Sequence, residues 1–159
     1  MPPAKRKHAP VRQSVHVNCP IDDAFRLFTE GFAQWWPLAS YSLTGTEAEQ
    51  CELEPWTGGR VLERTASGEE HAWGSVLAWD PPERLRLSWH PGGEDHRSQT
   101  VDVEFATEAR GTRVTVTHTG WETPGVAVCS LSGDYNVMWS VILRNHFAVF
   151  VPEHMLVTA

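Results

Sequence analysis

Two neighbouring segments in which apolar and polar residues alternate constrain the fold more than any other feature. They are residues 99–107 (QTVDVEFAT) and 112–119 (TRVTVTHT), separated by a short turn. Antiparallel pairing through that turn gives three pairs on one face: Phe105 with Val114, Val103 with Val116, and Val101 with His118. Because successive strand residues point to opposite faces, the acidic and threonine side chains between them face solvent. The sequence therefore predicts a sheet that is apolar on one face and solvated on the other.

Further strands and two helical regions surround this hairpin. Residue patterns between turns predict strands at 11–17, 50–54, 59–64, 71–79 and 84–89. Residues 20–36 have helical spacing, and Gly31 predicts a break into two short helices. The longest helical region, residues 134–151, carries one apolar stripe made of Trp139, Ile142, Leu143, His146, Phe147 and Phe150. Only this helix is long enough to cover the apolar face of the sheet.

The expected fold class is therefore α+β. A curved antiparallel sheet of about six to seven strands wraps around the C-terminal helix, and two short helices follow the first strand.

Length and charge limit the classes of function. A chain of 159 residues predicts one domain, here 11–159, preceded by a disordered basic tail at 1–10. A net charge of −7 argues against nucleic-acid binding. The most apolar run, 137–143, is far shorter than the ~20 residues of a membrane span, so no membrane insertion is expected. Three widely spaced cysteines without a CxxC pair favour a reducing, cytoplasmic location.

Several local stretches are similar to one protein family. They are CPIDDAFRLFT (19–29), LEPWTGGRVLER (53–64), WGSVLAWDPPERLRLSW (73–89), GTRVTVTHTGW (111–121), and the pair Trp139 and Leu143 in the last helix. In this order and spacing the chain resembles the START-like (SRPBCC) superfamily, and within it the homologues of the activator of the 90-kDa heat-shock-protein ATPase. Met138 departs from the pattern, since many relatives have glycine there, so the seating of the last helix is expected to differ.

The resemblance implies a helix-grip fold, as in the birch-pollen allergen. It also implies a hydrophobic cavity between the curved sheet and the long helix that often holds an apolar ligand, and a link to the stress response. Lipid and steroid carriers, hormone-binding proteins and polyketide cyclases share this fold, so the fold alone does not choose among these functions.

The hairpin formed by 59–64 and 71–79 offers the clearest candidate chemistry. If residue 63 pairs with 71, then 61 pairs with 73, and one face carries Val61, Glu63, His71 and Trp73. Val61 is apolar, so this face is expected to look into the cavity, where a carboxylate beside an imidazole could act as acid and base. The alternative is an ion pair outside the cavity, because a register slip or a bulge at 74–76 would turn the set outward.

Two other histidines lie on faces that are expected to be buried. His118 is on the apolar side of its strand and His146 is on the stripe of the last helix, where a lone histidine is more often a satisfied core residue than a ligand. With His71 they could form a three-nitrogen zinc site, but no spacing motif supports one. Phosphate-loop, dinucleotide, GxSxG and HExxH motifs are absent from the sequence. We therefore expect no metal and no cofactor, and whether the protein is an enzyme stays open.

Eight tryptophans either fill the core or line a cavity. Trp35 and Trp36 are consecutive on a helix, so at most one is expected to point fully inward. Large aromatic rings with a few polar side chains are typical of a ligand pocket. The predicted ligand-binding set is Phe32, Trp36, Val61, Glu63, His71, Trp73, Leu87, Trp89, Val103, Val116, His118, Trp139, Leu143, His146 and Phe147. A loop at 120–133 is expected to cover the cavity.

The favoured hypothesis is non-catalytic binding of a small apolar or amphipathic molecule, such as a lipid, a sterol or an aromatic polyketide. One alternative is a cyclase or hydrolase that uses Glu63 with His71 or His118. Another is a module that binds a chaperone partner. Formation of a homodimer also stays open.

Overall fold

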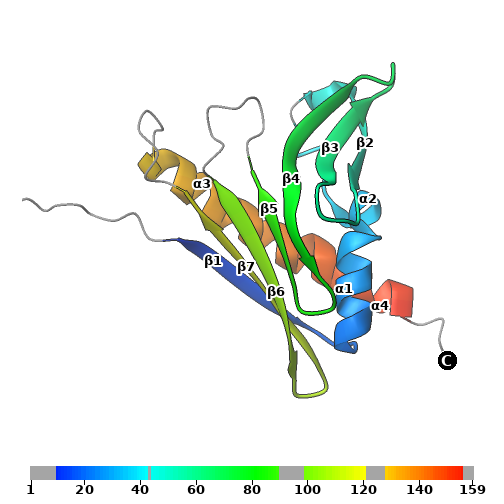
Figure 1. Cartoon of the computed structure of the whole chain (residues 1–159), viewed down its shortest axis with the longest axis vertical. Coiled ribbons are helices and arrows are strands. Elements are labelled where there is room, and N and C mark those ends of the chain that lie inside the picture. Colours follow the sequence, from blue (N-terminus) through cyan, green and yellow to red (C-terminus); the bar gives the residue numbers. More distant parts are fainter. Residues whose placement is uncertain (1–9, 43, 90–98, 121–127, 156–159) are drawn as a thin grey trace, which may run out of the picture.

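The sheet is built from seven antiparallel strands within the part of the chain that the computed structural model describes, which is residues 10–42, 44–89, 99–120 and 128–155. The strands are β1 (Val11–Val17), β2 (Ala48–Leu53), β3 (Arg60–Thr65), β4 (Glu70–Asp80), β5 (Arg84–Ser88), β6 (Thr100–Glu108) and β7 (Gly111–Thr119). Their order in the sheet is β1-β7-β6-β5-β4-β3-β2, so the first strand pairs with the last and the others follow the chain (Figure 1).

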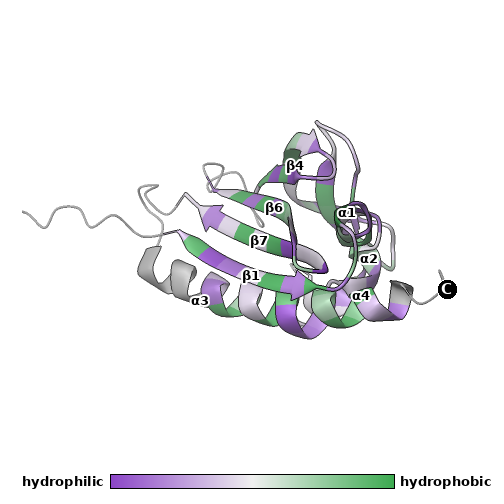
Figure 2. Ribbon diagram, turned by 90° about the horizontal axis from the view of Figure 1, so that it is seen from below, coloured by the Kyte–Doolittle hydropathy of each residue, from purple (hydrophilic) through white to green (hydrophobic). Residues whose placement is uncertain are grey.

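One long helix at the C-terminal end covers a face of this sheet, as expected for the helix-grip fold. It consists of α3 (Val128–Val141), a π-helical segment η3 (Ile142–Phe147) and α4 (Ala148–Met155). Figure 2 shows this helix running beneath β1, β7 and β6. The helix begins earlier than predicted, because residues 128–133 form its first turns rather than a covering loop. The rest of the predicted loop, residues 121–127, lies outside the described residues.

The two short helices and their break agree with the prediction. They are α1 (Ile21–Thr29) and α2 (Phe32–Trp35), and a single 3-10 turn, η1 (Gly45–Glu47), follows them. Gly31 lies between α1 and α2, and a Cβ atom there would lie 2.5 Å from the carbonyl oxygen of Leu27 and 2.8 Å from the ring of Phe150, so the position requires glycine. None of the described helices has the length and apolarity that a membrane span needs.

The pairing of β6 with β7 is the predicted one, with Val103 opposite Val116 and Val101 opposite His118. In the β3–β4 hairpin, Glu63 lies opposite His71 as predicted, but Val61 lies opposite Gly74 instead of Trp73. A register irregularity between these pairs accounts for the difference. Trp73 nevertheless points into the core and is only 2 % exposed.

Candidate functional site

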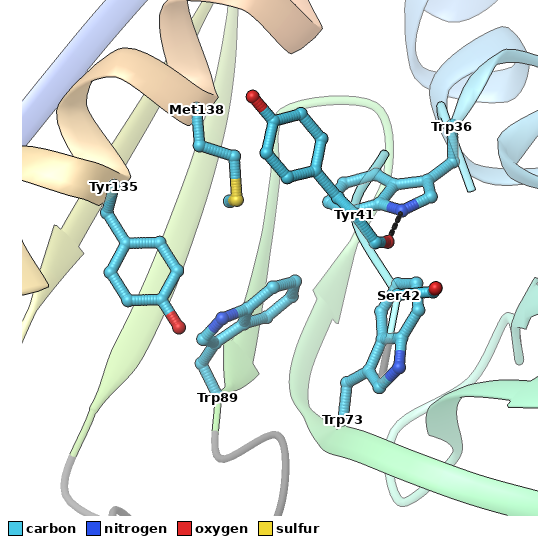
Figure 3. Close-up of a pocket in the computed structure, with 7 residues that line it drawn as sticks. All are labelled: Trp36, Tyr41, Ser42, Trp73, Trp89, Tyr135 and Met138. Atoms are coloured by element: carbon cyan, nitrogen blue, oxygen red, sulfur yellow. Dashed lines mark hydrogen bonds between the residues drawn. The ribbon is translucent and has the colours of Figure 1, made fainter. Parts of the chain in front are cut away.

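A pocket of about 270 Å³ lies between the sheet and the long helix. The described residues that line it are Trp36, Tyr41, Ser42, Trp73, Trp89, Tyr135 and Met138 (Figure 3). They come from the end of α2, from the segment after it, from β4, from the residue after β5, and from α3. The walls are mainly aromatic, and hydroxyl groups of tyrosine and serine supply polar atoms.

Four tryptophans form a continuous group, which we call the indole cluster: Trp36, Trp73, Trp89 and Trp139. In five of the six pairs the ring centroids lie between 5.2 and 6.2 Å apart, in tilted or edge-on arrangements that aromatic pairs prefer. All four are buried, and three of them border the pocket. The rings therefore fill the core and also form the pocket wall.

Glu63 lies behind this wall and is fully buried. Its Oε1 accepts a hydrogen bond from the indole nitrogen of Trp73 at 2.8 Å. Its Oε2 accepts from the backbone nitrogen and the hydroxyl of Thr44, at 2.8 and 2.6 Å. Glu63 thus connects β3 to a pocket-lining indole and to the segment that carries Tyr41 and Ser42.

His71 has a different position from the one that the acid–base pair with Glu63 requires. Its side chain is 35 % exposed, and its Nε2 lies 3.3 Å from Oε1 of Glu69. His71 keeps its predicted place opposite Glu63 in the ladder, but its imidazole contacts Glu69 near the surface instead of entering the pocket. The described pocket lining includes neither Glu63 nor His71.

His118 is a buried, hydrogen-bonded core residue, as its position on the apolar side of β7 predicted. The indole nitrogen of Trp139 donates to its Nδ1 at 3.0 Å, and its Nε2 lies 3.0 Å from Oε1 of Gln99. Because an indole N–H only donates, Nδ1 must be the unprotonated nitrogen, and Nε2 donates to Gln99. Burial lowers the pKa of His118 to about 3, so the imidazole is neutral at physiological pH.

The remaining residues of the predicted set divide between core and periphery. His146 is half-buried in the π-helical segment, away from the pocket lining. The buried core around the pocket contains Phe32, Val61, Leu87, Val103, Val116, Trp139, Leu143 and Phe147. Among the described residues, no group of three or more histidine, cysteine, aspartate or glutamate side chains could hold a metal ion.

Four pocket-lining residues were missing from the prediction: Tyr41, Ser42, Tyr135 and Met138. Tyr135 and Met138 precede Trp139 by four and one positions, so helical spacing could have found Tyr135. Tyr41 and Ser42 lie in an irregular segment, where no periodic signal marks the inward side chains.

The sequence comparison identifies the family. The model of the activator of Hsp90 ATPase homolog 1-like proteins matches residues 18–133. The chain belongs to this family. No curated protein matches the sequence of this family member.

Solved structures give relatives at two levels of similarity. An anthrahydroquino-γ-pyrone synthase, Txn09, is 33 % identical over 77 % of this chain and 83 % of that chain, with a TM-score of 0.53. A protein from Mesorhizobium loti is 14 % identical over 91 % of this chain and 97 % of its own, with a TM-score of 0.67. The Aha1 dimer from Colwellia psychrerythraea is 13 % identical over 84 % and 90 %, with a TM-score of 0.57. The last two similarities establish the shared fold.

Proposed function

We propose that this protein binds a planar aromatic molecule of the polyketide type in the pocket beside the indole cluster. The observation that carries the proposal is that Trp36, Trp73 and Trp89 border one pocket of about 270 Å³. Flat indole faces stack well on a flat ring system, whereas a flexible acyl chain makes no use of their shape. The volume is close to the lower end of the ~300–1,000 Å³ of small-molecule sites, so a ligand of two or three rings is favoured.

The anchoring of the pocket walls supports this proposal. The indole nitrogen of Trp36 donates to the carbonyl oxygen of Tyr41 at 2.9 Å, and that of Trp73 donates to Glu63. These bonds fix the ring planes before a ligand arrives, which reduces the entropy lost on binding. The relative with 33 % identity is named for an anthrahydroquino-γ-pyrone, which is a fused aromatic ring system.

A second candidate function is the closure of a ring on such a molecule, and the similarity to a synthase favours it. In this case the acid–base roles first considered for Glu63, His71 and His118 are not favoured, because the described lining contains none of them. The hydroxyl groups of Tyr41 and Tyr135 are better placed to exchange protons with a bound molecule.

The first test measures binding of flavone, a planar γ-pyrone, against lauric acid and cholesterol. Flavone should quench tryptophan fluorescence and raise the melting temperature by several degrees at about a hundred times its dissociation constant. Met138→Trp, which places a ring in the pocket, should abolish binding while the protein stays folded. Trp56→Phe is the control, because Trp56 is 53 % exposed and outside the pocket lining.

The outcomes separate the alternatives. Binding of the acyl chain or the sterol but not of flavone would contradict the proposed ligand class. Absence of binding by all three would direct attention to the chaperone-partner hypothesis. Acceleration of the conversion of 2-hydroxydibenzoylmethane to flavone, with loss of water, would support the second candidate.

A further inference from the structure

The indole nitrogens of the cluster differ in how they are satisfied. Each indole carries one N–H group, which can only donate. The N–H groups of Trp36, Trp73 and Trp139 donate to acceptors within the protein, at 2.9, 2.8 and 3.0 Å. These three donors therefore hold rings of the indole cluster in place.

Trp89 is the exception. Its ring is only 3 % exposed, yet its Nε1 makes no hydrogen bond of good geometry within the described part of the chain. The ring cannot simply turn toward solvent, because it packs against Trp139 at 5.6 Å, Trp73 at 6.0 Å and the imidazole of His118 at 6.0 Å. Its backbone is also fixed, since the Trp89 nitrogen donates to the Gln99 carbonyl at 3.0 Å. Buried donors are almost always satisfied, and the protein group beside this N–H is the Tyr135 hydroxyl, in a poorly aligned contact that a ligand acceptor could replace.

The hydroxyl of Tyr135 lies beside this N–H in the same pocket (Figure 3). The phenol ring packs on His118 with a centroid distance of 4.4 Å. Burial raises the pKa of Tyr135, and a side-chain hydrogen bond with Trp89 lowers it with the smaller effect. The phenol therefore keeps its proton at neutral pH and can donate it in a hydrogen bond.

We propose that Trp89 and Tyr135 together bind the ring carbonyl oxygen of the planar ligand. A carbonyl oxygen has two lone pairs, so it can accept from the indole N–H and from the phenol O–H at the same time. Nε1 of Trp89 is buried. The ligand's carbonyl oxygen therefore reaches it only when the Tyr135 phenol turns aside. In that position the phenol O–H donates to the same carbonyl oxygen. The pocket then selects quinones and γ-pyrones over hydrocarbons and ethers of the same shape. This selection rests on the proposed function, since it requires a planar ligand in the pocket.

The test compares flavone with 2-phenyl-4H-chromene, in which a CH₂ group replaces the carbonyl. The wild-type protein should bind flavone about tenfold more tightly, the factor expected for one net hydrogen bond. Trp89→Phe keeps an aromatic ring but removes the N–H, so it should bring the two affinities close together. Tyr135→Phe should reduce the preference in the same direction.

Trp73→Phe is the matched control, because it removes an N–H group that already donates to Glu63. It is expected to lower both affinities and to leave their ratio unchanged. Equal binding of the two probes by the wild type, or an unchanged ratio in Trp89→Phe, would overturn this inference while the planar-ligand function stands. If neither probe binds, the proposed function and the inference fail together. Thermal unfolding of each variant establishes that the fold is retained.

Discussion

At the scale of single residues, Glu63 and His118 act on the pocket through the tryptophans that they hold. Each is fully buried and accepts the indole N–H of a cluster member, Trp73 for Glu63 and Trp139 for His118. A buried polar group that is hydrogen-bonded in this way restricts the ring to one orientation. The same contacts remove both side chains from direct chemistry on a ligand. The presence of these two polar side chains in the core is thus explained by the tryptophan rings that they orient.

The prediction for Glu63→Gln follows from its three donors. The amide nitrogen of glutamine cannot accept, so the N–H or O–H group that faces it loses its partner, at a cost of about 1–3 kcal/mol in the free energy of unfolding. Urea unfolding measures the loss, and tryptophan emission reports the release of Trp73. Glu52→Gln is the control, because Glu52 forms an exposed ion pair with Arg64 and should cost less than ~1 kcal/mol. If the two variants are equally stable, Glu63 does not hold the wall.

The sequence identified Trp73 and Trp89 as pocket residues because large rings on the apolar face of a sheet must face the interior. It was wrong to expect that only one of Trp35 and Trp36 is buried, since their exposures are 3 % and 5 %. Trp36 is the C-cap of α2 and has extended backbone angles, so its side chain leaves the helix in a direction that helical spacing does not describe. Pro37 favours extended angles at the residue before it, so the end of α2 could be predicted from the sequence, but the direction of the Trp36 ring could not.

At the scale of elements, two irregularities account for the other differences. In the π-helical segment, residues five apart align, so Phe147 follows Ile142 into the core and His146 is displaced from the buried stripe. In β4, the irregularity near Gly74 keeps Trp73 inside although His71 stays near the surface. Residue patterns predict regular elements well, whereas a single inserted residue changes which side chains face the cavity.

Gly74 is the position at which β4 tolerates no side chain. A Cβ atom there would lie 1.8 Å from the carbonyl oxygen of Ser88, so the backbones of β4 and β5 would have to separate. Gly74→Ala should therefore cost at least ~3 kcal/mol in the free energy of unfolding, at the upper end for overpacked sites. Gly68→Ala is the comparison, because Gly68 has open space around it and only a positive φ of 93° to accommodate, at about 1–2 kcal/mol. A smaller loss for Gly74→Ala than for Gly68→Ala in urea unfolding would contradict the close approach.

At the scale of the whole molecule, the fold follows from the need to bury one apolar face of the sheet, which the alternating residue pattern indicates. The alternating strands leave one apolar face, and the C-terminal helix covers it; this much was predictable, together with the register of β6 and β7. The hydrogen-bond partners of His118 were not predictable, because they lie in other parts of the chain. Gln99 meets His118 across the β6–β7 pairing, and Trp139 reaches His118 only when the helix has packed on the sheet. Their contacts make the stability of the whole fold depend on the protonation of one imidazole.

The stability should fall as the pH falls below the usual histidine range. Burial lowers the pKa of His118 to about 3, whereas an unfolded histidine has a pKa of about 6.5. Between these values the unfolded chain binds a proton that the folded protein does not bind, so the free energy of unfolding decreases with decreasing pH. From pH 7 to pH 5 the loss from this residue should be about 2 kcal/mol. Urea unfolding at pH 7, 6 and 5 measures it.

The comparison with His118→Asn isolates this contribution. Asparagine can still accept from Trp139 but does not titrate, so the variant should start less stable at pH 7 and lose about 2 kcal/mol less than the wild type by pH 5. Glu54, Glu70 and Glu108 have pKa values lowered by arginine hydrogen bonds, and their contributions are lost mainly below pH 4.5, outside this window. The other histidines are present in both proteins and cancel in the difference. If the free energies of unfolding of the two proteins had the same pH dependence, the imidazole of His118 would be protonated in the folded state. The interior behind the indole cluster would then be more hydrated than its hydrogen bonds indicate.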